Sequence, residues 1–215
     1  MKIALSFLSR NFDYFKTMEL INQSNADFIH VDVADGLFVN NITPYDKDML
    51  DALKKSKKKK DVHLMTLHIE KFIEVFSYIK PEYITYSFDA TTNHNKIIKC
   101  IKEKGCKVGV AIDPLTEIDA LLPILKKVDL VLVLSILPGY GGQKFLASTP
   151  ERIEKLIKLR KEKKLNFLIN VDGGVNEESV RLLKENLPDM VVAGSYVVKS
   201  MNYNERIAIL KDKQK

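Results

Sequence analysis

The stretch LVLVLSILPGYGGQKFLASTPERIEKLIKLRKEKKLNFLINVDGG, residues 130–174, holds one complete structural repeat. It opens with an apolar, β-branched run (130–136) and closes with a second one (166–172). Between them, residues 149–164 start with Thr149 and Pro150, which are typical of an N-cap and a first helical turn. Ile153, Leu156 and Ile157 then fall on one helical face. The stretch predicts a strand–helix–strand unit with two parallel strands.

The same alternation runs along the rest of the chain. A helix is expected over 176–186 with Asn176 as its N-cap, and further strand-like runs occupy 2–8, 27–33, 61–66, 83–89, 107–113 and 190–196. Eight strands, each followed by a helix, predict an α/β fold, a single-domain (β/α)8 TIM barrel over residues 1–215. An open doubly wound sheet is the alternative. It usually has five or six strands and a glycine-rich first turn, and the turn SRNFD (9–13) lacks glycine.

Composition narrows the class of protein. Of the 215 residues, 46% are hydrophobic, which suits one sizeable core. The two cysteines have no metal-ligand spacing, so we expect a reducing, cytoplasmic setting. No apolar run approaches the roughly 20 residues that a membrane helix needs. The net charge is +6, but the lysine run 54–60 has no interleaved aromatic residue and is expected to be a solvated helix end plus loop. We therefore expect neither a nucleic-acid nor a membrane partner.

Polar side chains interrupt three of the predicted strands. Because side chains alternate along a strand, His30 and Asp32 share one face, which we expect to point into the barrel. Ile29, Val31 and Val33 form the other face, against the helices. The next strand repeats the pattern with Asp61, His63 and Met65, and a later one adds Asn170 and Asp172.

Burying two imidazoles and two carboxylates is costly unless they pair or bind a metal. His30, Asp32, His63 and Asp172 form a reasonable set of nitrogen and oxygen ligands for a divalent cation such as Zn²⁺, Mn²⁺ or Fe²⁺. The alternative is that each is an ordinary hydrogen-bonded core residue. Convergence of four such residues from three strands favours the metal site.

Glycines gather after the last three strands, in PGYGGQ (138–143), DGG (172–174) and AGS (193–195). Glycine lets backbone N–H groups approach an anion closely, and barrels commonly bind phosphate in the loops after strands 7 and 8. Tight turns also need glycine, so each cluster alone is weak. Together they predict a phosphate site.

Several motifs in register make the sequence similar to the ribulose-phosphate 3-epimerase family. They are HVDVADG (30–36), DVHLM (61–65), PGYGGQKF (138–145), VDGGV (171–175) and VAGS (192–195), with Ser6 in ALSFL. The resemblance implies that one divalent metal ion (Zn, Mn, Fe or Co) is held by His30, Asp32, His63 and Asp172, with no organic cofactor. It further implies that Asp32 and Asp172 are the two acid/base residues.

The implied reaction inverts C3 of a ketopentose phosphate, interconverting ribulose 5-phosphate and xylulose 5-phosphate in the pentose phosphate pathway. The resemblance also suggests a homo-oligomer. The substrate-binding residues it implies are Ser6, His63, Gly139, Gly141, Gly142, Gly173, Gly174, Gly194 and Ser195.

Some positions around the sugar depart from the family pattern: Ala34, Asn40, Ser87 and Leu137. They leave an allulose 6-phosphate 3-epimerase open as an alternative. A non-catalytic phosphate-binding barrel would be expected to lose a ligand, and none is lost. A relative of the orotidine-phosphate decarboxylases would carry a D-x-K-x-x-D motif, and the lysine is absent here. Asp35 and Gly36 are expected to form the turn at the end of their strand.

Overall fold

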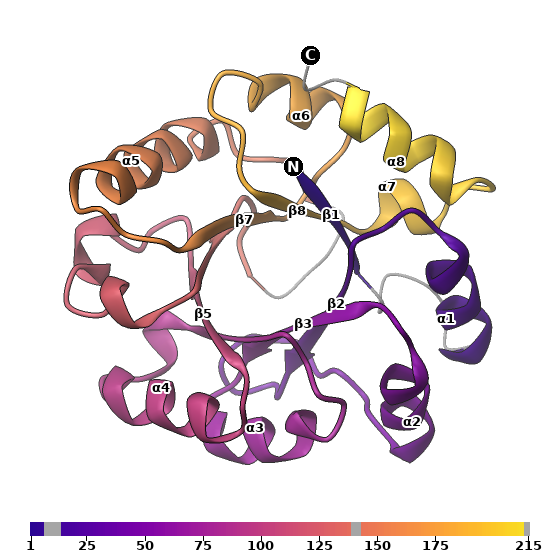
Figure 1. Ribbon diagram of the computed structural model, residues 1–215, viewed down its shortest axis with the longest axis horizontal. Helices are drawn as coiled ribbons and strands as arrows, with labels where there is room; N and C mark the ends of the chain where they lie inside the picture. Colours follow the sequence, from indigo (N-terminus) through magenta and orange to yellow (C-terminus); the bar gives the residue numbers. More distant parts are fainter. Residues whose placement is uncertain (7–13, 139–142, 213–215) are drawn as a thin grey trace.

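Eight parallel strands close into a barrel (Figure 1). The computed structural model describes residues 1–6, 14–138 and 143–212. Each strand pairs with the next in the chain, and the last pairs with the first, with Ile3 opposite Val191. The (β/α)8 prediction is confirmed. The strands are β1 (Lys2–Ser6), β2 (Phe28–Ala34), β3 (Lys59–Met65), β4 (Tyr83–Ser87), β5 (Lys107–Ile112), β6 (Leu130–Leu134), β7 (Leu168–Asp172) and β8 (Met190–Ala193).

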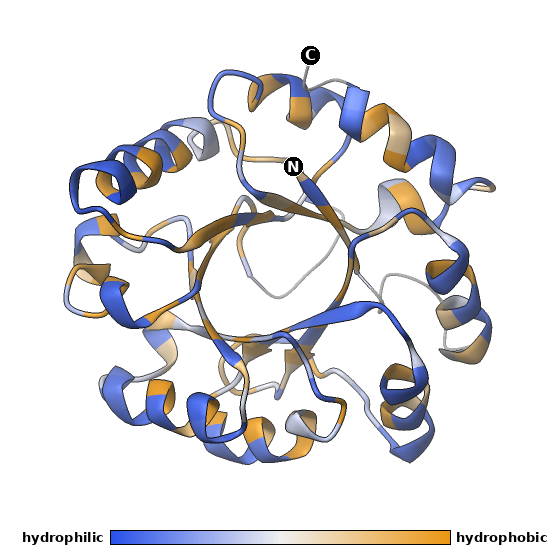
Figure 2. Ribbon diagram, viewed as in Figure 1, coloured by the Kyte–Doolittle hydropathy of each residue, from blue (hydrophilic) through white to orange (hydrophobic). Residues whose placement is uncertain are grey.

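The helices form a ring around the barrel, with apolar residues turned toward the strands and polar residues outward (Figures 1 and 2). They are α1 (Tyr14–Gln23), α2 (Lys47–Lys55), α3 (Ile69–Ser77), α4 (His94–Glu103), α5 (Thr149–Glu162), α6 (Glu177–Leu182), α7 (Ser195–Val198) and α8 (Tyr203–Asp212), with a short 3₁₀ helix, η2 (Phe88–Ala90), after β4. In the described residues, no helix is both long enough and apolar enough to cross a membrane.

The crossover from β5 to β6 differs from the expected pattern. It contains two 3₁₀ helices, η3 (Ile118–Leu121) and η4 (Leu125–Lys127), in place of an α-helix. Pro114 and Pro123 explain the difference, because proline has no N–H to donate and its ring clashes with the preceding helical turn. The crossover still covers the barrel, since Ile118 and Leu125 are buried.

Two apolar clusters stabilise the barrel, one between the strands and the helices and one in the barrel interior. Outside it, Ile29, Val31 and Val33 pack in one cluster with helix residues such as Leu53 and Phe72. The predicted outward face of β2 is therefore confirmed. Inside the barrel a second cluster contains Ala4, Phe28, Tyr83, Ala111, Leu130, Leu132, Leu134, Met190 and Val192. Polar residues take over the interior positions of β2, β3 and β7 toward their carboxyl ends, which is where the chemistry of such barrels occurs.

Two local predictions need correction and one is confirmed. Helix α5 starts at Thr149 itself, so Ser148 holds the N-cap position. Strand β3 starts at Lys59, opposite Phe28, so the lysine run extends into the sheet instead of ending as a loop. Asn176 caps α6 as expected, because its side chain accepts from the backbone N–H groups of residues 178 and 179.

Candidate active site

The register of β2 and β3 sets two polar pairs side by side in the barrel interior. His30 lies opposite Asp61, and Asp32 lies opposite His63, one step nearer the carboxyl ends. The two histidines and Asp61 are fully buried. The side chains of Asp32 and Asp172 keep 26% and 20% of their surface exposed. The two carboxylates can therefore meet a ligand that enters from the mouth.

All four predicted ligands converge on one point. His30 Nε2 lies 3.2 Å from Asp32 Oδ1 and 3.7 Å from Asp172 Oδ2. His63 Nδ1 lies 3.3 Å from Asp32 Oδ1. One donor atom from each of these residues falls within 4.8 Å of the others. The structure thus brings together side chains from β2, β3 and β7, as the alternation along each strand predicts.

The donor set fits a divalent cation. It offers two imidazole nitrogens and two carboxylate oxygens, which suit Zn²⁺, Mn²⁺ and Fe²⁺. His63 Nε2 is buried and has no hydrogen-bond partner among the described residues. The nitrogen of His63 that faces the cluster is Nδ1, 3.3 Å from Asp32 Oδ1, so a metal ion held with Asp32 would be bound through Nδ1. The site can therefore hold one metal ion.

Asp61 contacts a predicted ligand; alternation along its strand placed it on the inward face but gave it no role. Its Oδ2 lies 3.0 Å from His30 Nδ1. The same oxygen accepts from the Asn170 amide at 3.3 Å, and the other oxygen, Oδ1, accepts from the Thr85 hydroxyl at 2.9 Å. A carboxylate behind a ligating histidine fixes the ring and its tautomer. Asp61 therefore leaves His30 Nε2 directed at Asp32 and Asp172.

Gly109 on β5 makes this arrangement possible. A Cβ atom at this position would lie 2.1 Å from the Thr85 hydroxyl oxygen, far inside contact distance. Because glycine has no such atom, Thr85 can face the barrel interior and reach Asp61. The orientation of His30 thus depends on a residue three strands away in the sheet.

The charges of the cluster push its pKa values apart. Burial alone would lower the pKa of His30, but the carboxylates of Asp32 and Asp61 outweigh burial and hold it well above 6.5. Burial would raise the pKa of Asp32, yet His30 and His63 keep that pKa well below its usual range. For Asp172, burial and the negative charge of Asp32 raise the pKa to about 6. In the metal-free protein one carboxylate is ionised while the other keeps a proton up to about pH 6.

The predicted substrate-binding residues lie around the cluster where the structure describes them. Ser6 donates to Asp32 Oδ2 at 3.2 Å. Gly173 and Gly174 follow β7 with φ angles of 111° and 62°, and a Cβ on Gly174 would come within 2.8 Å of the Phe145 backbone nitrogen. Gly194 precedes the first residue of α7, Ser195. Gly139, Gly141 and Gly142 lie outside the described residues.

The departures from the family pattern also have defined positions. Ala34 is buried, one inward step beyond Asp32. Ser87 turns its hydroxyl to the Leu64 carbonyl, at 3.2 Å. Leu137 and Asn40 are exposed. None of these four side chains belongs to the metal-ligand cluster.

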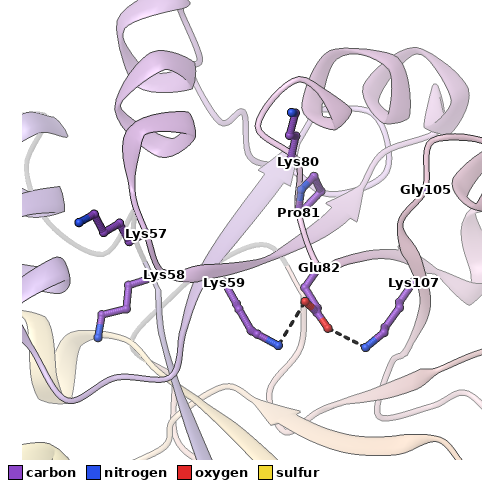
Figure 3. Close-up of a pocket in the computed structure, with 8 residues that line it drawn as sticks. All are labelled: Lys57, Lys58, Lys59, Lys80, Pro81, Glu82, Gly105 and Lys107. Carbon is purple, nitrogen blue, oxygen red and sulfur yellow. Dashed lines mark hydrogen bonds and ion pairs between the residues drawn. The ribbon is translucent and has the colours of Figure 1, made fainter.

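A separate hollow of about 330 Å³ lies at the amino ends of β3, β4 and β5 (Figure 3), whereas Asp32, His63 and Asp172 lie toward the carboxyl ends of their strands. Lysines surround it, but Lys59 and Lys107 share the carboxylate of Glu82, at 3.3 Å and 2.6 Å. Lys57 and Lys58 extend away from Glu82. The ammonium groups do not converge on one point, so the hollow is not the site of chemistry.

The sequence matches one protein family over most of its length. The ribulose-phosphate 3 epimerase family matches residues 2–198. Ribulose-phosphate 3-epimerase from Helicobacter pylori is 37% identical over 200 residues, covering 93% of this chain and 92% of that one. Its counterpart from Buchnera aphidicola is 36% identical over 219 residues, with coverage of 98% and 94%.

Solved structures support the fold. A 3-hexulose-6-phosphate synthase from Salmonella typhimurium has a TM-score of 0.70 at 18% identity, covering 100% of this chain and 98% of that one. The KGPDC of Streptococcus mutans has a TM-score of 0.67 at 13% identity, with coverage of 99% and 96%. At these identities the likeness concerns the barrel alone. By sequence, however, the chain belongs to the ribulose-phosphate 3-epimerase family, a family of sugar-phosphate epimerases.

Proposed function

We propose that this enzyme inverts C3 of ribulose 5-phosphate to give xylulose 5-phosphate, and catalyses the reverse reaction. The relatives that share about a third of its sequence carry the name ribulose-phosphate 3-epimerase. Inversion by proton transfer requires one group that accepts the C3 proton and a second that delivers a proton to the opposite side of the carbon. The cluster inside the barrel offers such a pair.

The observation that carries the proposal is the convergence of two carboxylates on one point inside the barrel. His30 Nε2 lies 3.2 Å from Asp32 Oδ1 and 3.7 Å from Asp172 Oδ2. In the metal-free protein the pKa of Asp32 is held well below its usual range and that of Asp172 is raised to about 6, so the two carboxylates differ in proton affinity, as a base and an acid require. Asp32 on β2 and Asp172 on β7 are separated in the barrel by β8 and β1. They can therefore face a substrate carbon from two sides and exchange roles in the reverse reaction.

The four ligands His30, Asp32, His63 and Asp172 would hold the divalent metal ion. When bound, the ion supplies Lewis-acid stabilisation of the negative charge that develops on the sugar oxygens during proton removal. Asp61 holds the ring of His30, and the Ser6 hydroxyl holds the second oxygen of Asp32. These contacts keep the proton-accepting carboxylate in one orientation.

The phosphate group would lie near the ends of β7 and β8. Gly173 and Gly174 have positive φ angles and no Cβ, which lets the Ile136 side chain and the Phe145 backbone approach this loop closely. Gly194 and Ser195 lie at the neighbouring strand end. Backbone N–H groups in such loops bind phosphate without needing a basic side chain.

The test follows ribulose 5-phosphate in D₂O by NMR with metal-replete protein, with allulose 6-phosphate in a parallel sample. We expect deuterium at C3 and formation of xylulose 5-phosphate, both lost on chelation and restored by the metal. Faster turnover of allulose 6-phosphate would assign the longer sugar as substrate. Absence of exchange with both sugars would refute the proposal.

Carboxylate variants test the assignment of roles. Asp32→Asn and Asp172→Asn should each abolish epimerisation, because each removes one of the two proton-transferring groups. Asp129→Asn is the matched control. Its carboxylate accepts from the Val108 backbone N–H at the amino end of the barrel, away from the cluster. An active Asp172→Asn variant would contradict the two-aspartate mechanism.

A further inference from the structure

Asp35 lies three residues beyond Asp32, just past the end of β2, and its carboxylate accepts hydrogen bonds from two loops. Oδ1 accepts from the backbone N–H groups of Leu37, at 2.9 Å, and Phe38, at 3.1 Å. Together with Gly36 at a φ of 76°, these bonds form the turn that the sequence predicts.

The second oxygen reaches the loop after β3. Oδ2 accepts from the Thr66 hydroxyl at 2.6 Å and from the Leu67 backbone N–H at 3.0 Å. These bonds outweigh the effect of burial and lower the pKa of Asp35 to about 2, so it is ionised at neutral pH. One carboxylate therefore joins the loops that follow β2 and β3, the strands that carry His30, Asp32 and His63.

The loop held by Asp35 returns to its own strand through Thr43. The Thr43 hydroxyl donates to the Asp32 carbonyl at 3.1 Å and accepts from the Ala34 backbone N–H at 3.1 Å. The Thr43 N–H also donates to the Ala34 carbonyl at 2.9 Å. The segment 35–43 is thus fastened at both ends, by Asp35 to the neighbouring loop and by Thr43 to β2.

Between these two fastenings the loop forms an apolar wall. Val39 is buried against Ala34 and Met65, with Phe38 packed beside them, in a cluster separate from the two main apolar clusters. Ala34 and Met65 are paired in the sheet, one inward-facing step beyond the pair Asp32 and His63. The wall therefore stands directly above the metal ligands on their open side.

We propose that Asp35 is a positioning residue for the reaction: by joining the two loops, it holds the Phe38–Val39 wall over Asp32 and His63, where the sugar binds. This inference rests on the proposed function for the identity of the substrate. The wall keeps water from the reacting carbon and fixes the sugar against the proton-accepting carboxylate. Misplacement of a substrate by about 1 Å can cost on the order of 100-fold in rate.

The variant Asp35→Asn tests the inference. An asparagine has one accepting oxygen, and its NH₂ group takes the place of the other. The NH₂ group then faces the N–H donors of one of the two loops, so at least one backbone N–H loses its hydrogen-bond acceptor. We expect a 10- to 100-fold fall in kcat/KM, carried mainly by a higher KM. Metal affinity, measured by titration of metal-free protein, should stay within twofold, since no ligand is touched. Of the amides of Leu37, Phe38 and Leu67, those that lose their acceptor should exchange with D₂O at least tenfold faster.

Asp46→Asn is the control, because Asp46 is also a carboxylate that accepts a backbone N–H, that of Met49 at the start of α2. It should leave all three readouts unchanged. Thr66→Val removes one donor to Asp35 and should give a smaller shift in the same direction, which keeps the test available if Asp35→Asn does not fold.

The outcomes separate this inference from the proposed function. Unchanged KM and unchanged amide exchange in Asp35→Asn would overturn the role of Asp35 in an active enzyme. A fall in metal affinity equal to the fall in kcat/KM would also overturn it, because the effect would then lie in the ligands. If the wild-type protein turns over neither sugar, the proposed function fails, and faster exchange of the amides that lose their acceptor in Asp35→Asn would still support the joined loops.

Discussion

Replacement of Asp61 by asparagine should weaken metal binding about tenfold while preserving the fold. In the variant an amide oxygen can still accept from His30 Nδ1 and from Asn170, and Thr85 can turn its hydroxyl to accept from the new NH₂ group. What is lost is the negative charge. Hydrogen bonds to charged groups contribute about 1.5–3 kcal/mol and neutral ones about 0.5–1.5 kcal/mol. The difference, about 1–1.5 kcal/mol, corresponds to roughly a factor of ten in affinity.

The variant Asp61→Ala should behave differently. It leaves three buried donors without an acceptor, on His30, Thr85 and Asn170. Each unsatisfied donor costs about 1–3 kcal/mol, so the free energy of unfolding should fall by about 3 kcal/mol or more. Urea denaturation of the metal-free protein measures this loss.

The assay for metal affinity is competition between metal-free protein and a chromophoric chelator. Asp129→Asn serves as the control, since the same substitution at the opposite end of the barrel should leave the affinity unchanged. An Asp61→Asn protein that binds metal as tightly as wild type would refute the reasoning that Asp61 orients His30.

Three further predictions follow from the same contacts. The pKa values of Asp172 and His30 are raised in the folded metal-free protein, which therefore holds protons that the unfolded chain releases. The Tm of the metal-free protein should consequently fall as the pH rises from about 4 through 6 and above. Metal binding displaces these protons, and the Tm gained on adding metal should be larger at pH 8 than at pH 5; a gain independent of pH would contradict this. Gly109→Ala should destabilise the protein by about 1–3 kcal/mol in urea and weaken metal binding, because the new Cβ displaces Thr85; an unchanged affinity would argue against that displacement. His94→Ala removes the ring that stacks on Phe88 of η2, with ring centroids 4.3 Å apart. It should lower the free energy of unfolding by about 1 kcal/mol and leave kcat/KM within twofold of wild type. A large kinetic loss would place His94 in the active site.

The inward face of β2 could be predicted because alternation along a strand is a property of the backbone. His30 and Asp32 are two residues apart, so any strand through them directs both to one side. Asp61 was visible in the same way on β3. Its contact with His30, however, depends on the register between two strands, which is set by the closure of the whole barrel. The sequence contains no local signal for that register.

Other features needed three-dimensional packing. The sequence gives no reason for glycine at position 109. In the structure the Thr85 side chain occupies the space that a Cβ at this position would need. The role of Asp35 depends on Thr66 and Leu67, which belong to a different loop. The β5–β6 crossover, by contrast, carries a local signal, because Pro114 and Pro123 disfavour one continuous α-helix between these strands.

The pairing of β1 with β8 has a consequence for how the chain acquires its function during synthesis. Ser6 is made early, whereas Asp172 and the strand that closes the ring on β1 are made late. A nascent chain that ends before β7 can form local helices and strand pairs, but it lacks one ligand and leaves two sheet edges unpaired. Such edges are prone to pair with other chains, and contacts this distant in sequence form slowly. We therefore expect that the four ligands can hold a metal ion together only after β7 has joined the ring.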